Sequence, residues 1–244
     1  MKSLEKYVRT RAKNLRKCLT AYSESGTDET IHDIRVEIKK LKAVLQLAGS
    51  ARPRFNAHKV FVPLRDIFRK AAAIREKDVA IKLAKLHKLK ATGKRSESGQ
   101  QSAKEIFEFD IPAFIKHVKQ QEKKILKEIA KISRKEFTAA LSKQLKITKK
   151  VLYPNVIVKK LHKTRKGIKE VLYLSDVRPV ISEEQRKFLE EMAGFIGDLH
   201  DKQSMMSTVT AEDRVKLETE VQKDIDRIAA RARSFYEKRD WPLM

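Results

Sequence analysis

Glycine and proline, the residues that most often interrupt helices, are scarce in this chain of 244 residues, which has seven glycines and six prolines. Both disfavour helix interiors, so their scarcity leaves room for long helices. Apolar residues also recur every three to four positions over long stretches, and we therefore predict an all-α protein. The expected helices lie near residues 2–22, 28–48, 57–74, 76–92, 111–147, 154–177, 183–203 and 211–238. An N-cap for the second is expected within Ser25–Thr30, and Ser182 is expected to cap the seventh.

Cysteine and long apolar runs are also missing. Cys18 is the only cysteine, which excludes an intramolecular disulfide framework and a zinc site built from several cysteines. No apolar run approaches the roughly 18 residues of a membrane span. The first residues are charged and lack the apolar core of a signal peptide. We therefore expect a cytoplasmic protein with no membrane partner.

Acidic residues are too few to balance the basic ones. The chain has 56 Lys and Arg against 32 Asp and Glu, a formal net charge of +24. Such an excess repels itself, and a polyanionic partner is its natural explanation. Nucleic-acid binders, ribosomal proteins and polyphosphate binders all fit this composition, so charge alone does not choose among them.

One basic pattern is more specific than the composition, because it places its cations on one side of a helix. The segment from His32 to Lys42 has the spacing His-x2-Arg-x3-Lys. At about 100° per residue, Arg35, Lys39 and Lys42 fall within about 80° of His32, beside the apolar face. Lys40 belongs to the same basic cluster in the sequence. This segregation from the acids of the helix predicts an anion site.

The same spacing returns 130 residues later in His162, Arg165 and Lys169, with Lys166 nearby. Arginine pairs with phosphate oxygens through two bonds, lysine supplies a mobile charge, and histidine donates a hydrogen bond or gains charge. We expect the two helices to face a shared groove. The alternative for each histidine is a core side chain that is hydrogen-bonded to a neighbour.

The polar stretch 93–104 is the predicted linker between a first four-helix half, residues 1–92, and a second, residues 105–244. In each half a charged corner, Ala71–Ala80 or Phe195–Ser204, follows the motif helix. These corners could bring Arg75 and His200 to the same groove.

The paired helices resemble the CHAD family, the conserved histidine α-helical domain. That family has a His-x2-Arg-x3-basic-basic-x-basic helix and, after a long spacer, a Leu-His-x2-Arg-x3-Lys-x3-Tyr helix, each followed by a Leu-Gly-x2-Arg/Asn-Asp-like corner. The first helix is matched by His32, Arg35, Lys39, Lys40 and Lys42, and the second by Leu161, His162, Arg165, Lys169 and Tyr173. The corners are matched by Ile196, Gly197, His200 and Asp201 and, approximately, by Arg75, Glu76, Asp78 and Val79. Glu170, Leu172 and Ala72 depart from the pattern.

The resemblance spans about residues 2–238 and implies a single domain over the chain. It implies two pseudosymmetric four-helix bundles around a basic central groove or pore that binds inorganic polyphosphate. Binding residues would be His32, Arg35, Lys39, Lys40, Lys42, Arg75, His162, Arg165, Lys166, Lys169 and His200. An association with polyphosphate granules would follow.

Two other functions remain open. A nucleic-acid or RNA-binding role fits the charge, but sequence-tolerant single-strand binders pair basic grooves with exposed aromatic residues. Aromatic residues make up 7% of the chain, and Phe61 and Phe68 fall at core spacing. An enzyme acting on phosphates is the third possibility, and no Walker A motif is present. We expect no catalytic activity, no cofactor and no metal.

Overall fold

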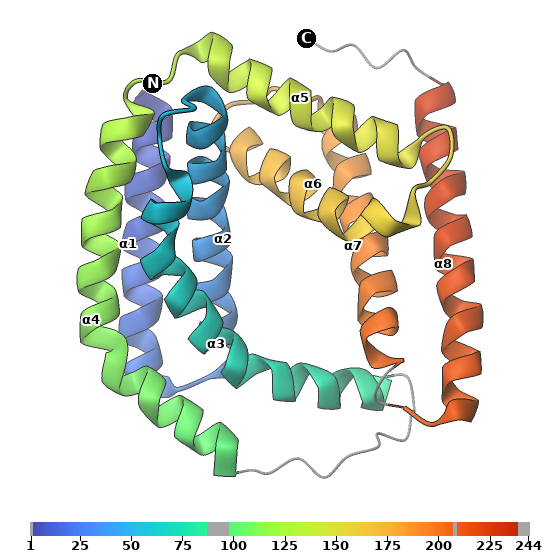
Figure 1. Ribbon diagram of the computed structural model, residues 1–244, viewed down its shortest axis with the longest axis horizontal. Coiled ribbons are helices and arrows are strands. Elements are labelled where there is room, and N and C mark those ends of the chain that lie inside the picture. Colours follow the sequence, from blue (N-terminus) through green and yellow to red (C-terminus); the bar gives the residue numbers. More distant parts are fainter. Residues whose placement is uncertain (1, 87–97, 207–208, 239–244) are drawn as a thin grey trace. The chain divides into compact units, whose positions relative to one another are not determined.

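The computed structural model describes the backbone of residues 2–86, 98–206 and 209–238, and the side chains of residues 3–74, 101–206 and 209–238. These residues form eight α-helices and one short 3-10 helix, and no β-strand occurs among them (Figure 1). The predicted all-α class is confirmed. In chain order the elements are α1 (Lys2–Ser25), α2 (Asp28–Ala51), α3 (Ala57–Leu86), α4 (Ser98–Ile129), α5 (Arg134–Leu152), η1 (Val158–Lys160), α6 (Leu161–Ser175), α7 (Glu183–Met205) and α8 (Ala211–Glu237).

The helices gather into two compact units, each described by itself. Unit 1 contains α1, α2, α3 up to Ala80, α4 and the start of α5 up to Phe137. Unit 2 contains the described end of α3 from Ile81 and the chain from Thr138 in α5 through α8. Residues 93–97 of the predicted linker lie outside the described residues, and from Ser98 onward the chain belongs to α4. The predicted division into halves 1–92 and 105–244 stays a prediction.

In unit 1, α1 packs against both α2 and α4 (Figure 1). Aromatic rings fill the contact between α1 and α4: the centroid of Phe107 lies 5.2 Å from Tyr22 and 5.3 Å from Phe114. Both arrangements fall within the range of favourable aromatic pairs. The apolar stripe of α2, which includes Ile34 and Ile38, is buried. This burial fixes which side of α2 the motif cations can occupy.

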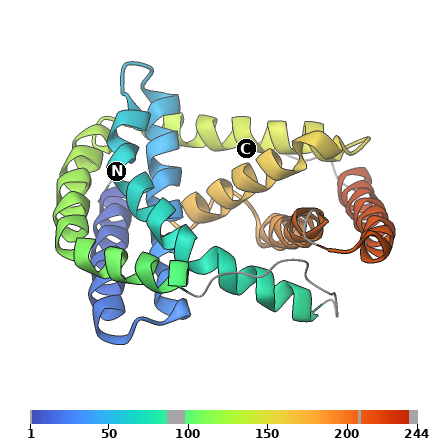
Figure 2. The same cartoon turned by 60° about the horizontal axis from the view of Figure 1, so that its bottom comes forward.

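In unit 2, α7 packs against α6 and α8, and Figure 2 views α7 and α8 nearly end-on. Phe188 of α7 stacks on Phe235 of α8 with 3.8 Å between ring centroids. At Gly167 of α6, a Cβ atom would overlap the Gln144 side chain of α5. The Gln144 side chain of α5 therefore lies against the backbone of the motif helix at Gly167.

Three of the predicted helix extents differ clearly from the structure. The helix expected at 154–177 is α6, which begins only at Leu161, after the 3-10 helix η1. The helices expected at 57–74 and 76–92 are one helix, α3, over the described residues. The helix expected at 111–147 is two, α4 and α5, which meet at a break around Ser133. The backbone N–H of Glu136 donates to the Ser133 hydroxyl at 3.2 Å, and the Ser133 N–H donates to the Glu136 carboxylate at 2.7 Å. This capping box starts α5.

The predicted caps of α2 and α7 are confirmed. Thr27 accepts a hydrogen bond from the backbone N–H of Thr30 and begins α2. Ser182 and Gln185 form a complete capping box at the start of α7. Within the described chain, none of the helices combines the length and apolarity that crossing a bilayer requires.

Candidate anion-binding site

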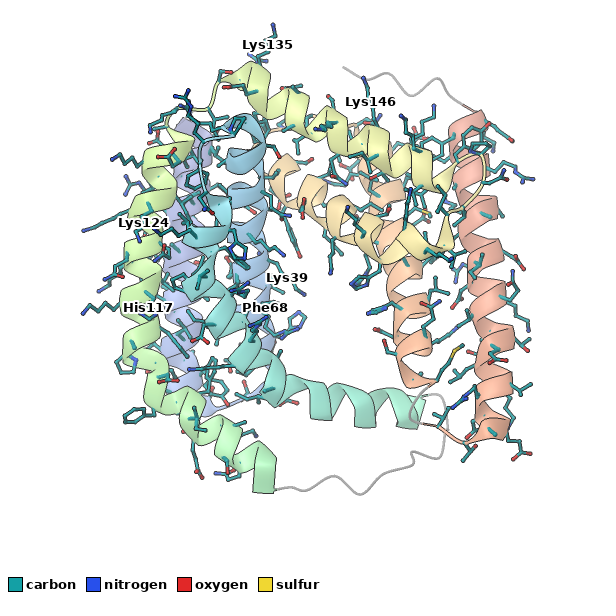
Figure 3. The ribbon with its side chains drawn as sticks, in the orientation of Figure 1. Lys39, Phe68, His117, Lys124, Lys135 and Lys146 are labelled. Carbon is teal, nitrogen blue, oxygen red and sulfur yellow. The ribbon has the colours of Figure 1, made fainter. Side chains whose placement is uncertain are left out.

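The first motif lies on α2 in unit 1, and its cations stand beside the buried stripe. His32 and Lys39 are exposed, and Arg35 and Lys42 are half-buried. Figure 3 shows Lys39 next to Phe68 of α3, whereas His117 and Lys124 project from the other side of the unit on α4. The structure thus separates the motif cations from the general lysine surface of α4.

Arg35 is held by α3 through two contacts with one residue. Its Nη1 donates to the backbone carbonyl of Phe68 at 3.3 Å, and its Cζ lies 4.2 Å from the centroid of the Phe68 ring. The Nζ atom of Lys39 lies 5.9 Å from the same centroid. Lys42 approaches Phe61 in the same way, at 5.4 Å. These cations sit within cation–π range, which reduces the freedom that they would lose on binding an anion.

Lys40 is not brought together with the other cations of the stripe. Its Nζ lies 2.8 Å from the carboxylate of Glu37, and the same oxygen is 3.2 Å from Nη1 of Arg11 on α1. Glu37 is buried. Lys40 follows His32 by eight residues, which turns it about 80° around the helix to the side opposite Arg35. The charge of Lys40 is therefore paired with Glu37, which also links α2 to Arg11 on α1.

The second motif lies on α6 in unit 2 and is held by α7. Nε of Arg165 donates to the backbone carbonyl of Ala193 at 2.9 Å. A Cβ atom at Gly197 would lie 2.8 Å from Nη2 of Arg165, closer than such atoms normally approach. The absence of a side chain at Gly197 therefore makes the space for the guanidinium. The rings of His162 and His200 meet with centroids 4.2 Å apart.

The basic residues of the second motif have too little negative charge nearby to offset their burial and mutual repulsion. The pKa of His162 is lowered, first by desolvation and then by Lys166, His200 and Arg165. Desolvation also lowers the pKa of half-buried Lys169, and Arg165 adds to the effect, while Glu190 opposes it. Each cation is thus made less favourable by burial and by its neighbours. An anion placed here would relieve that cost.

The two motif arginines make equivalent contacts. Arg35 donates to the carbonyl of Phe68, and Arg165 donates to the carbonyl of Ala193, in each case on the helix that follows in the described chain. Ala72 follows Phe68 by four residues, as Gly197 follows Ala193. Ala72 and Gly197, the corner positions matched in the sequence, therefore each lie four residues after the carbonyl that accepts the arginine bond. This agreement supports an internal repeat.

The same register pairs Arg75 with His200, three residues beyond Ala72 and Gly197 respectively. His200 contacts His162 within unit 2. The side chain of Arg75 lies outside the described residues, so its predicted role stays a prediction. Whether the two motifs face one groove depends on how unit 1 lies against unit 2. The shared groove therefore also stays a prediction.

Sequence reasoning missed the part played by Phe61 and Phe68. Both were assigned to the core from their spacing, but the structure places them half-buried beneath Lys42, Lys39 and Arg35. Their seven-residue separation matches that of Arg35 and Lys42, which was the available signal. Within the described residues, no group of three His, Cys, Asp or Glu side chains is arranged to hold a metal ion.

In this all-helical protein, two helices carry the same histidine–arginine–lysine spacing, and the arginine of each is hydrogen-bonded to the next helix. These features define a basic helical domain. The chain belongs to the CHAD domain family, whose model matches residues 6–210. The fold is similar to that of a solved structure described as the crystal structure of the CHAD domain from the plant Ricinus communis. That match has a TM-score of 0.56 and 14% identity, and it covers 99% of this chain and 88% of that one. A search of curated proteins finds no match.

Proposed function

We propose that this protein binds inorganic polyphosphate without catalysing its turnover. The observation behind the proposal is the fixed guanidinium in each motif, Arg35 on the Phe68 carbonyl and Arg165 on the Ala193 carbonyl. A guanidinium has five N–H donors, so a backbone bond that occupies one still leaves donors for phosphate oxygens. Such preorganised donors suit a dense, flexible polyanion that has no bases to recognise.

The half-buried position of Lys169 supports the same function. Desolvation, with a smaller contribution from Arg165, lowers the pKa of Lys169, so a nearby anion would stabilise its charged form. Phosphoryl groups would supply that negative charge along the whole motif helix. The proposal includes one groove shared by both motifs, for which a calorimetric stoichiometry of one long chain per protein is the test.

Nucleic acid is the alternative ligand. Single-strand binders commonly stack bases on exposed aromatic rings. At the first motif, Arg35 lies over the Phe68 ring, so this face is already occupied. Competition between polyphosphate and RNA for one labelled ligand decides between them. Displacement of polyphosphate by RNA at equal phosphate concentration would favour the alternative.

The binding test uses exposed lysines, because reversing Arg35 or Arg165 would also place a carboxylate against a backbone carbonyl. Lys39→Glu combined with Lys166→Glu should weaken polyphosphate binding by about tenfold for each lost contact. The control pair, Lys216→Glu and Lys223→Glu on α8, carries the same charge change. Equal losses from both pairs would mean diffuse basicity, and phosphate release from polyphosphate would contradict the non-catalytic role.

A cytoplasmic location with association to polyphosphate granules belongs to the same proposal. It is tested by imaging a fluorescent fusion of the wild-type chain beside the Lys39→Glu/Lys166→Glu variant. Granule association that survives in the variant would separate localisation from this site.

A further inference from the structure

The chain has no acidic residue between Glu136 and Glu170, a stretch that spans α5, η1 and the motif part of α6. Lysines in this stretch therefore depend on distant parts of the chain for neutralisation. In the part of the chain that the structure describes, Lys143, Lys146 and Lys150 of α5 form no ion pair. Their charge is left to solvent.

These three residues form a lysine row on α5. All are exposed, and their spacing of three and then four residues places them on one side of the helix. Leu141 and Leu145 are buried on the other side. Figure 3 shows Lys146 projecting away from α6.

The cationic side of α6 leads towards the lysine row. Gly167 marks the side of α6 that meets α5, because the Gln144 side chain fills its Cβ position. Measured around α6 from His162, Gly167 lies at about 140°, Lys163 at about 100° and Lys166 at about 40°. Lys163 and Lys166 are exposed, so positive charge continues from the motif to the edge where α5 packs.

On α5, Lys143 and Lys150 lie nearer to that edge than Lys146, which is turned about 160° from Gln144 and points away from α6 (Figure 3). Measured from Gln144, which faces α6, Lys143 and Lys150 lie about 100° to 120° to one side, while buried Leu145 lies about 100° to the other. The solvent-facing sides of the two helices therefore join. The backbone N–H of Ile157 donates to the carbonyl of Val151 at 2.9 Å and folds the connection back onto α5.

We propose that the lysine row is a second polyanion subsite, onto which a long polyphosphate chain extends from the motif of α6. This inference rests on the proposed function and adds a preference for chain length. The row spans about 10 Å along α5, and Lys163 and Lys166 bridge it to the motif. We expect a ligand of three phosphoryl groups to be held by the motif alone, whereas a long chain would extend from the motif onto the row.

The test compares tripolyphosphate with long-chain polyphosphate on the full chain. The variant Lys143→Gln/Lys146→Gln/Lys150→Gln removes the row while keeping residues that favour helix. Lys116→Gln/Lys119→Gln/Lys123→Gln on α4 is a matched control, because these three exposed lysines have the same spacing. Calorimetry or fluorescence anisotropy over a range of salt concentrations gives the affinities.

The row variant should bind long chains more weakly, with the log–log salt slope reduced by about 2 for three lost contacts. Its affinity for tripolyphosphate should equal that of wild type, and the control should match wild type for both ligands. Unchanged long-chain affinity in the row variant, or an equal loss in the control, would overturn the inference while leaving the proposed function standing. Failure of the wild-type protein to bind either ligand would overturn both.

Discussion

The guanidinium of Arg165 fills the space in which a larger residue at position 197 would place its Cβ atom. The Cβ atom of alanine there would lie 2.8 Å from Nη2, so the arginine or α7 must shift. Gly194, on the same helix, has no atom within 4 Å of an added Cβ. The two glycines therefore form a natural pair of test sites.

We predict that Gly197→Ala lowers polyphosphate affinity about tenfold, the value of one charge-assisted contact. Gly194→Ala should leave binding unchanged and stabilise the protein by about 0.5–1 kcal/mol through helix propensity. Titration calorimetry and thermal unfolding check both variants. Wild-type affinity in Gly197→Ala would show that the position of Arg165 is not set by this glycine.

The lowered pKa of His162 gives a second prediction at this scale. The folded state disfavours the imidazolium, so the unfolded chain binds more protons as pH falls below about 6.5. The contribution of His162 to the free energy of unfolding is therefore fully present above about pH 6.5. It is lost as the pH falls through the lowered pKa that His162 has in the folded state. Polyphosphate should oppose this loss by favouring the charged ring, so its affinity should rise on acidification.

Thermal unfolding between about pH 7.5 and pH 5.5, with and without polyphosphate, measures both effects. The variant His162→Asn keeps a polar side chain and should flatten both pH dependences. Identical pH profiles in wild type and variant would assign the titration to other groups.

Helical spacing was sufficient to predict which side of α6 carries His162, Arg165 and Lys169, because one angle per residue fixes the stripe. It could not predict the carbonyl of Phe68 as the partner of Arg35, since that contact joins two helices and ends on a main-chain atom. Lys40 was predicted as a binding residue because it matches the basic pair of the CHAD helix pattern, not from its angle around the helix. Its ion pair with Glu37 depends on where α1 packs, which the local pattern does not contain.

At the scale of elements, Pro112 explains the main difference between expected and observed helices. The prediction began a helix at residue 111, consistent with proline in a first turn. The structure instead continues α4 through Pro112. Phe107 and Phe114, on either side of it, pack together and bury fully. Burial of these rings offsets the roughly 3 kcal/mol that an interior proline costs.

Pro112→Ala tests this interpretation. Inside a helix the change restores a backbone donor and removes a steric clash, so the free energy of unfolding should rise by about 1–3 kcal/mol. At a first helical position the same change would be neutral or slightly destabilising. Chemical denaturation with circular dichroism distinguishes the two results.

The break between α4 and α5 had a readable signal in Ser133 and Glu136, which have the serine-x-x-glutamate spacing of a capping box. The apolar periodicity before and after Ser133 is continuous, so the sequence pattern predicted one helix across this break. By contrast, the cap at Thr27 follows Ser25 and Gly26, and the cap at Ser182 follows a segment interrupted by Pro179. Both caps were predicted correctly. Local chemistry therefore predicted the all-α class. It predicted helix ends less well, and it placed the start of α6 near residue 154, whereas the structure begins that helix at Leu161.

For the whole molecule, the charge of +24 acts in opposite directions on stability and on binding. Salt screens the repulsion among like charges in the free protein. It also reduces the gain from releasing counterions when a polyanion binds, with a log–log slope of roughly −0.7 per neutralised phosphate.

Added sodium chloride should therefore raise the melting temperature of the free protein while polyphosphate affinity falls. For about six contacts the slope should be about −4. Differential scanning calorimetry and binding isotherms over one salt series measure the two trends. A melting temperature that falls with salt would show that attractive ion pairs, such as Lys202 with Asp224, outweigh the net repulsion.

The bonds from Arg35 and Arg165 end on main-chain oxygens, which every residue type possesses. Evolution is therefore free to vary the side chains at the accepting positions, as Phe68 and Ala193 already illustrate. Descendants can exchange these residues and still hold both guanidiniums in place. Sequence similarity between the two motif regions should consequently be lost long before the two arginine contacts are lost.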